Sequence, residues 1–163
     1  MLFIYLLFVS YGQNIINYAN ISISNYSFSE CNVSGTIIIP KSIESIKEYV
    51  FFNCKKLEDI VFSNESFLKN IENDTFSFCI NLESIIIPKS IKLIGNYAFY
   101  NCEKLKSIVF SNESFLKNIG ARAFSSCNNL ESIIIPKMVK LTGNYAFYNC
   151  EKLKSIVFSN ESF

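Results

Sequence analysis

The most constraining feature of this sequence is a tandem duplication with a period of 48 residues. Residues 85–107 return at 133–155 with three changes, and residues 60–84 return at 108–132 with six changes. A shorter period lies inside this unit, because the six cysteines are spaced 23, 25, 23, 25 and 23 residues apart. A fixed period of about 20 to 50 residues is typical of solenoids, whose units bury their apolar faces only by stacking on neighbours. The sequence therefore predicts two alternating types of coil in one elongated body.

Composition limits the functions that such a body can have. Half of the 163 residues are apolar, the formal net charge is +1, and lysines alternate with Glu and Asp rather than forming a basic stripe. We expect no nucleic-acid partner. The chain has no histidine, which removes the usual general base and the commonest transition-metal ligand. We expect neither enzymatic activity nor a cofactor.

The first twelve residues, MLFIYLLFVSYG, form an apolar run too short to span a bilayer as a helix but as long as a signal-peptide core. With Ser10 and Gly12 at its end, we expect residues 1–12 to be a signal peptide cleaved after Gly12. Residues 13–36 then form a degenerate first coil, and residues 37–163 form the regular repeats, which end in mid-repeat. This organisation predicts a secreted or surface protein.

Seven N-x-[S/T] sequons would be acceptors for N-glycosylation in a secretory pathway. Their asparagines are Asn20, Asn25, Asn32, Asn64, Asn73, Asn112 and Asn160. Three of them, at 64, 112 and 160, are one sequon copied by the repeat, and a chain rich in Asn and Ser produces some sequons by chance.

The repeat also fixes the inward positions and the strands. Phenylalanine stands three residues before each cysteine, at Phe28, Phe51, Phe76, Phe99, Phe124 and Phe147. Leucine follows three residues after all but the first cysteine, at Leu57, Leu82, Leu105, Leu130 and Leu153. Six residues after each cysteine begins an apolar triplet that predicts a strand, at 37–39, 60–62, 85–87, 108–110, 133–135 and 156–158. A Pro or a Ser-Asn pair ends each strand, and Asn96 to Glu103 has the spacing of a short helical turn with Asn96 as its cap.

Two strings of this sequence carry a family resemblance: Leu82-x-x-Ile85-x-Ile87-Pro88, and Ile91-x-x-Ile94-Gly95-x-x-Ala98-Phe99-x-x-Cys102-x-x-Leu105. Over about residues 21–163 the chain resembles the BspA-type leucine-rich repeat, found in surface proteins of bacteria and parasitic protists. The resemblance implies an α/β repeat fold, a right-handed leucine-rich-repeat solenoid with a parallel β-sheet on its concave face. Short helical turns are then expected on the convex side. It also implies a role in adhesion or host interaction.

The sequence departs from this pattern at two places. Ser34 stands where the first coil should have leucine, and Gly95, Gly120 and Gly143 are replaced by Lys47 and Glu72 in earlier coils. The left-handed backbone that glycine permits is therefore not required in every coil.

The cysteines occupy one inward position of the repeat and include no C-x-x-C pair. We expect a ladder of buried free thiols that act as small apolar side chains. The alternative is an oxidised pair between adjacent coils, such as Cys31 with Cys54 near the irregular end.

Side chains alternate along a strand, so the middle residue of each triplet should face outward. These six residues form an apolar stripe: Ile38, Val61, Ile86, Val109, Ile134 and Val157. Contiguous exposed apolar surface usually marks a contact site. The alternative is that β-branched residues stand there for strand formation alone.

These observations favour a non-enzymatic leucine-rich-repeat protein that binds a protein or extracellular-matrix ligand through the stripe. The alternative is a structural segment of a longer solenoid without a binding role of its own, and a thiol-dependent enzyme is a distant third. Because the last coil has no polar closing unit, we also expect end-to-end self-association through it.

Overall fold

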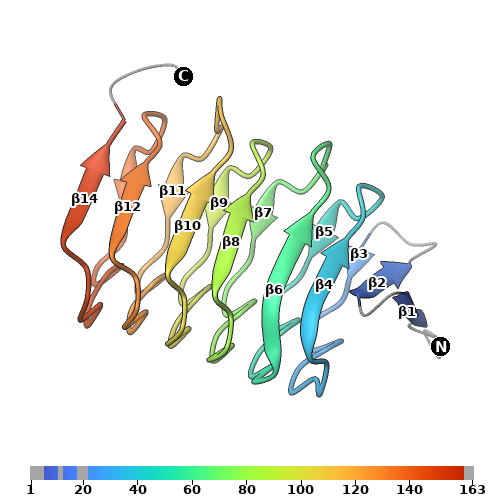
Figure 1. The fold of residues 1–163 in the computed structure, drawn as a ribbon. Coiled ribbons are helices and arrows are strands. Elements are labelled where there is room, and N and C mark those ends of the chain that lie inside the picture. Colours follow the sequence, from blue (N-terminus) through green and yellow to red (C-terminus); the bar gives the residue numbers. More distant parts are fainter. Residues whose placement is uncertain (1–5, 11–12, 18–21, 160–163) are drawn as a thin grey trace.

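The computed structural model describes residues 6–10, 13–17 and 22–159. Long and short strands alternate along the chain (Figure 1). The long strands are β2 (Gln13–Asn17), β4 (Gly35–Ile39), β6 (Leu57–Phe62), β8 (Ser84–Ile87), β10 (Ser107–Phe110), β12 (Ser132–Ile135) and β14 (Ser155–Phe158). The short strands are β3 (Ser22–Ile23), β5 (Ser45–Ile46), β7 (Asn70–Ile71), β9 (Leu93–Ile94), β11 (Asn118–Ile119) and β13 (Leu141–Thr142).

The long strands lie side by side in one layer and the short strands in a second layer behind them (Figure 1). Each strand pairs in parallel with the equivalent strand one coil away, as β8 does with β10 and β9 with β11. The repeat predicted a solenoid, and this is the parallel-strand form that the family resemblance implied. Residues of the predicted degenerate coil follow the same path, since β2 pairs in parallel with β4 and β3 with β5.

The first strand, β1 (Leu6–Ser10), pairs antiparallel with β2 and ends the long-strand sheet. It lies within the predicted signal peptide, whose other residues are outside the described ranges, so that assignment stays a prediction. The described part of the chain contains no apolar helix of membrane-spanning length.

The expected short helical turns are wrong, because the described ranges contain no helix at all. In the segment from Asn96 to Glu103, Tyr97 and Asn101 have left-handed backbones, with φ of 55° and 56°. Alternate N–H groups of this segment form hydrogen bonds to the next coil rather than within their own. Those of Tyr97 and Phe99 donate to carbonyl groups of the next coil at 2.9 and 2.8 Å. In a helix, every interior N–H group would donate to a carbonyl of the same segment. The turns instead form a ladder of hydrogen bonds between neighbouring coils, which a helix could not make.

The core lies between the two strand layers and the turns, at the inward positions read from the sequence. The phenylalanine row forms one continuous stack, with ring centroids 5.2 to 5.5 Å apart and nearly parallel planes from Phe28 to Phe147. Its four middle rings are fully buried, as are the first four leucines of the leucine row. Offset stacks of this kind add stability beyond the area that they bury.

Candidate binding surface

The outward face of the long strands carries the predicted apolar stripe. In β8, Ile85 and Ile87 are at most 1% exposed, whereas Ile86 between them is 61% exposed. The parallel register places Ile38 beside Val61, Ile86 beside Val109 and Ile134 beside Val157. The exposed members are Val61, Ile86, Val109, Ile134 and Val157, with exposed fractions of 42 to 61%. Ile38 is only half-buried at the start of the row.

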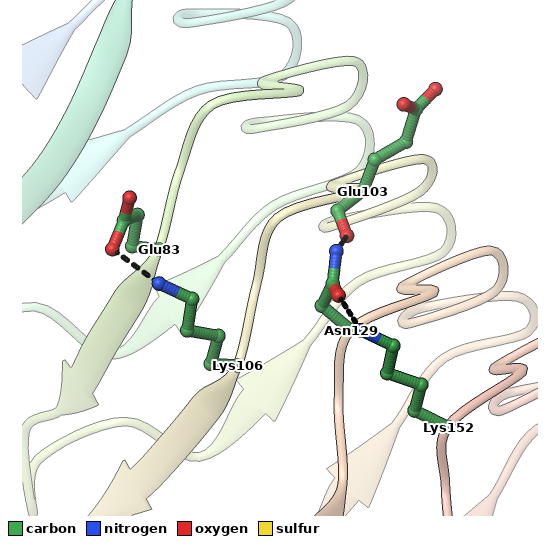
Figure 2. Close-up of polar contacts among 5 residues, drawn as sticks. All are labelled: Glu83, Glu103, Lys106, Asn129 and Lys152. Atoms are coloured by element: carbon green, nitrogen blue, oxygen red, sulfur yellow. Dashed lines mark hydrogen bonds and ion pairs between the residues drawn. The ribbon is translucent and has the colours of Figure 1, made fainter.

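Polar residues border the stripe along the starts of the long strands. Ser84, Ser107, Ser132 and Ser155 are all exposed. Beyond them the Lys106 ammonium donates to the Glu83 carboxylate at 2.8 Å, which lowers the pKa of that carboxyl (Figure 2). Lys154 and Glu131 make the equivalent pair two coils on, at 3.5 Å. Such exposed pairs add little stability, but they leave the apolar row bordered by charges that already have partners.

A second polar row lies farther along the turns. The side-chain amide of Asn129 donates to the Glu103 carbonyl at 2.7 Å and accepts from the Lys152 ammonium at 2.6 Å (Figure 2). Asn81 donates to the Lys55 carbonyl in the same way, at 2.6 Å. These bonds bridge successive coils, so they fix the coil spacing next to the sheet that carries the stripe.

The loops that follow β6 and β10 carry exposed aromatic residues that were not predicted from the sequence. Phe67 and Phe115 are 55% and 48% exposed. In each loop the preceding serine hydroxyl is buried and accepts the N–H of the following leucine, as Ser114 does from Leu116. This bond buries the leucine and turns the phenylalanine between them outward. The repeated Ser-Phe-Leu string was the signal that could have shown it.

A cleft of about 640 Å³ lies between β10 and β12 and the loops that follow them. Its walls include Val109 and Ile134 of the stripe, and Phe115 and Met138 of the loops. Exposed apolar residues of the strands and loops therefore meet at one place on the molecule.

The turn side of the solenoid presents a different, aromatic surface. Tyr97 and Tyr145 are 38% and 60% exposed, and the Arg122 guanidinium lies 5.0 Å from the Tyr145 ring centroid. Asp74 stands at the position that Tyr49 and Tyr97 occupy in the neighbouring coils, and partial burial raises the pKa of its carboxyl. Its negative charge in turn raises the pKa of the Tyr49 hydroxyl, which donates a hydrogen bond to it. Because Arg122 and Asp74 lie among its tyrosines, this surface is less uniform than the apolar stripe of the long strands.

The cysteine ladder differs from the main expectation at its first step. Cys31 and Cys54 form a disulfide, with Cα atoms 4.8 Å apart, so the predicted ladder of six free thiols is wrong there. Stacked coils place these α-carbons within the range that a disulfide requires. The sequence had offered this pair as the alternative.

The remaining four cysteines are free thiols as expected. Each donates to the carbonyl of a phenylalanine in the preceding coil, as Cys102 does to Phe76 at 3.2 Å. Burial raises the pKa of Cys79 to about 12 and raises those of Cys102 and Cys127 well above the ordinary value. Thiolate is the reactive form, so these positions are unsuited to nucleophilic catalysis.

The sequons lie in different environments. Asn25, Asn32, Asn64 and Asn112 are exposed. The Asn73 amide instead donates to Glu48 at 2.8 Å and accepts from the Asn96 N–H at 2.8 Å, and the sequon hydroxyl of Thr75 is fully buried. Asn20 and Asn160 lie outside the described residues. Glycosylation stays a prediction, and Asn73 is its least suitable site.

No cluster of three or more His, Cys, Asp or Glu side chains that could hold a metal ion occurs within the described ranges.

Among curated proteins, the sequence has no match. Solved structures do match. The pneumococcal vaccine antigen PcpA is 32% identical with a TM-score of 0.75, over 90% of this chain and 36% of that one. A leucine-rich cell surface protein of Faecalibacterium prausnitzii is 28% identical with a TM-score of 0.62, over 92% of this chain and 32% of that one. The chain thus spans about a third of the length of these two proteins.

A more distant similarity supports the fold alone. The leucine-rich repeat protein of T. pallidum is 24% identical with a TM-score of 0.70, over 93% of this chain and 67% of that one. The sequence profile of the BspA-type leucine-rich repeat region matches residues 69–162 in six copies. Solenoids of this family are generally non-enzymatic scaffolds for protein interaction. The match covers more than half of the sequence, and the chain belongs to the BspA-type leucine-rich repeat family.

Proposed function

We propose that this chain is the binding region of a secreted or surface-displayed adhesive protein, which holds a protein or extracellular-matrix ligand against the outward face of its long strands. One observation carries the proposal: five successive coils each expose a β-branched side chain at the same outward position, with Ile86 in register with Val109 and Ile134 with Val157. Strand propensity alone explains β-branched residues, but it requires neither their continuity nor the exposed phenylalanines beside them. Contiguous apolar surface of this kind usually serves contact with a partner.

Location outside the cell is part of the same proposal. It is supported by the apolar run of residues 1–12 and by similarity to a vaccine antigen and a cell surface protein. N-terminal sequencing of the mature protein checks it, since an intact Met1 would contradict secretion through a cleaved signal.

The double variant Val109→Asp with Ile134→Asp should lose at least about tenfold in affinity for immobilised basement-membrane matrix, because two carboxylates would have to be desolvated at the contact. Its circular dichroism should match that of the unsubstituted chain, since both side chains are exposed. Surface plasmon resonance gives the affinities.

The matched control is Tyr97→Asp with Tyr145→Asp, which places the same two charges on the turn side. Both residues are exposed and have positive φ, a conformation that Asp tolerates. Retained binding in this control, with loss in the stripe variant, supports the proposal. Loss only in the control would move the contact to the turn side, and no matrix binding by the unsubstituted chain would contradict adhesion to matrix.

End-to-end self-association is a second proposal. Leu141, Ile156 and Phe158 of the last described strands are 62%, 41% and 62% exposed. Sedimentation across a wide concentration range measures it, and a strictly monomeric chain would contradict it.

A further inference from the structure

The hydrogen-bonded ladder of long strands is interrupted between β10 and β12. Four residue pairs join β8 to β10, and four join β12 to β14, but in the part of the chain that the structure describes no ladder joins β10 to β12. Behind them the short strands remain continuous, because β11 pairs with both β9 and β13. The two coils are therefore hydrogen-bonded through their short strands but not through a ladder of their long strands, and we call the unpaired space between β10 and β12 the wedge.

The sequence explains one missing hydrogen bond at the end of these two strands. After β6, β10 and β14 stands a serine whose N–H donates to the last residue of the preceding long strand, as Ser111 donates to Ile87 at 3.0 Å. Pro136 occupies the equivalent position after β12, and proline has no N–H to donate to the Phe110 carbonyl. Pro88 stands in the same position after β8, where the ladder to β6 is reduced to two residue pairs.

The wedge is the cleft of about 640 Å³, a size within the range of ligand sites. Its apolar lining comes mainly from Val109, Phe110, Phe115, Ile134, Pro136 and Met138. The polar lining includes the hydroxyls of Ser107 and Ser132, the ammonium groups of Lys106 and Lys137, and the carboxylate of Glu113.

We propose that this cleft binds an extended peptide segment of the protein partner, with an aromatic side chain in the wedge and the main chain along its mouth. The two facing strand edges have no ladder between them, so they offer the backbone hydrogen bonds that a peptide main chain complements. The apolar walls accept the aromatic ring. Val109 and Ile134 also belong to the stripe. The inference rests on the proposed function, because it names the place on the stripe where the partner is anchored.

The chain offers a direct reporter for this site. It has two methionines, Met1 and Met138, of which Met138 lines the cleft. With methionine methyl groups labelled with ¹³C, the probe is the blocked peptide acetyl-Ser-Phe-Glu-amide. We expect a saturable shift of the Met138 methyl resonance, caused by the ring current of the bound phenylalanine. The same peptide with serine in place of phenylalanine should produce no saturable shift.

Pro136→Ser tests the role of the missing hydrogen bond. The new N–H can donate to the Phe110 carbonyl and close the wedge, so we expect roughly fivefold weaker peptide binding, the size of one added hydrogen bond in the closed state. Pro88→Ser is the matched control, because it makes the same substitution two coils away and should leave the affinity unchanged. Phe115→Ser removes an exposed wall residue without disturbing the core and should also weaken binding.

An unshifted Met138 resonance, an equal response to the serine peptide, or unchanged affinity in both Pro136→Ser and Phe115→Ser would overturn the inference. The outcome is separable from that of the adhesion experiment. A chain that adheres to matrix but does not bind the peptide refutes the cleft alone. A chain that binds the peptide at Met138 but does not adhere refutes adhesion and leaves the cleft as a peptide site.

Discussion

Phe99→Ala is expected to lower the free energy of unfolding by about 3–5 kcal/mol, the range for deleting a fully buried aromatic ring. The Phe99 ring is 0% exposed and lies 5.2 Å from the ring centroid of Phe76 and 5.3 Å from that of Phe124. Its loss would leave a cavity between two coils whose backbones are fixed by hydrogen bonds on both sides. Chemical denaturation followed by circular dichroism measures the change.

Phe147→Ala is the matched control for this prediction, because it deletes the same ring from the same row. Phe147 is only half-buried and stacks on one neighbour, the Phe124 ring at 5.5 Å. We expect a clearly smaller loss, since less apolar area returns to water and no enclosed cavity is left. A loss at Phe147 equal to or greater than that at Phe99 would contradict the larger contribution assigned to the enclosed ring.

The repeat period made the core and the sheets predictable. A residue that recurs at a fixed place in every coil has the same surroundings in every coil, so one correct placement of Ile85, Ile86 and Ile87 placed all the triplets. The alternation of inward and outward residues then followed from strand geometry. The placement of the stripe was available to sequence reasoning for this reason, although its role was not.

The turns were not predictable in the same way. The spacing of Ala98, Phe99 and Cys102 fits one face of a helix, and all three side chains are fully buried as that spacing requires. The choice between a helix and successive turns depends on hydrogen bonds to the next coil, such as that from Phe99 to Ala123 at 2.8 Å. Those partners are set by how closely coils stack, which a local sequence pattern does not contain.

Sequence reasoning also missed the cleft, because it treated equivalent strands as identical. One difference between these strands is a backbone donor that Ser111 has and Pro136 lacks. The sequence shows this difference, but it was read only as a signal for the end of a strand. Its effect on pairing appears once the two coils are placed side by side.

The glycines near the short strands have a different purpose from the one that the sequence suggested. Gly95, Gly120 and Gly143 are absent from the described residues with positive φ, so they are not needed for a left-handed backbone. They allow close stacking instead. A Cβ atom built on Gly120 would lie 2.5 Å from the backbone nitrogen of Asn96 and 2.5 Å from the carbonyl carbon of Gly95.

Gly120→Ala should therefore destabilise the chain by about 1–3 kcal/mol, the usual cost of overpacking a closely packed site. The obstructing atoms belong to the backbone of the neighbouring coil, so no side chain can rotate away. Relief requires separation of the two coils, which would weaken bonds such as that from the Gly120 N–H to the Ile94 carbonyl, at 2.7 Å. Gly120→Val should destabilise the chain more, because valine is larger and branched at Cβ.

Lys47→Ala is the matched control at the equivalent position of an earlier coil. A Cβ atom is already present there and the side chain is exposed, so the change in the free energy of unfolding should lie within about 0.5 kcal/mol. Thermal and chemical unfolding of the three variants give the comparison. If Gly120→Ala is as stable as Lys47→Ala, the coils can separate without cost, and the close backbone approach does not limit the sequence at this position.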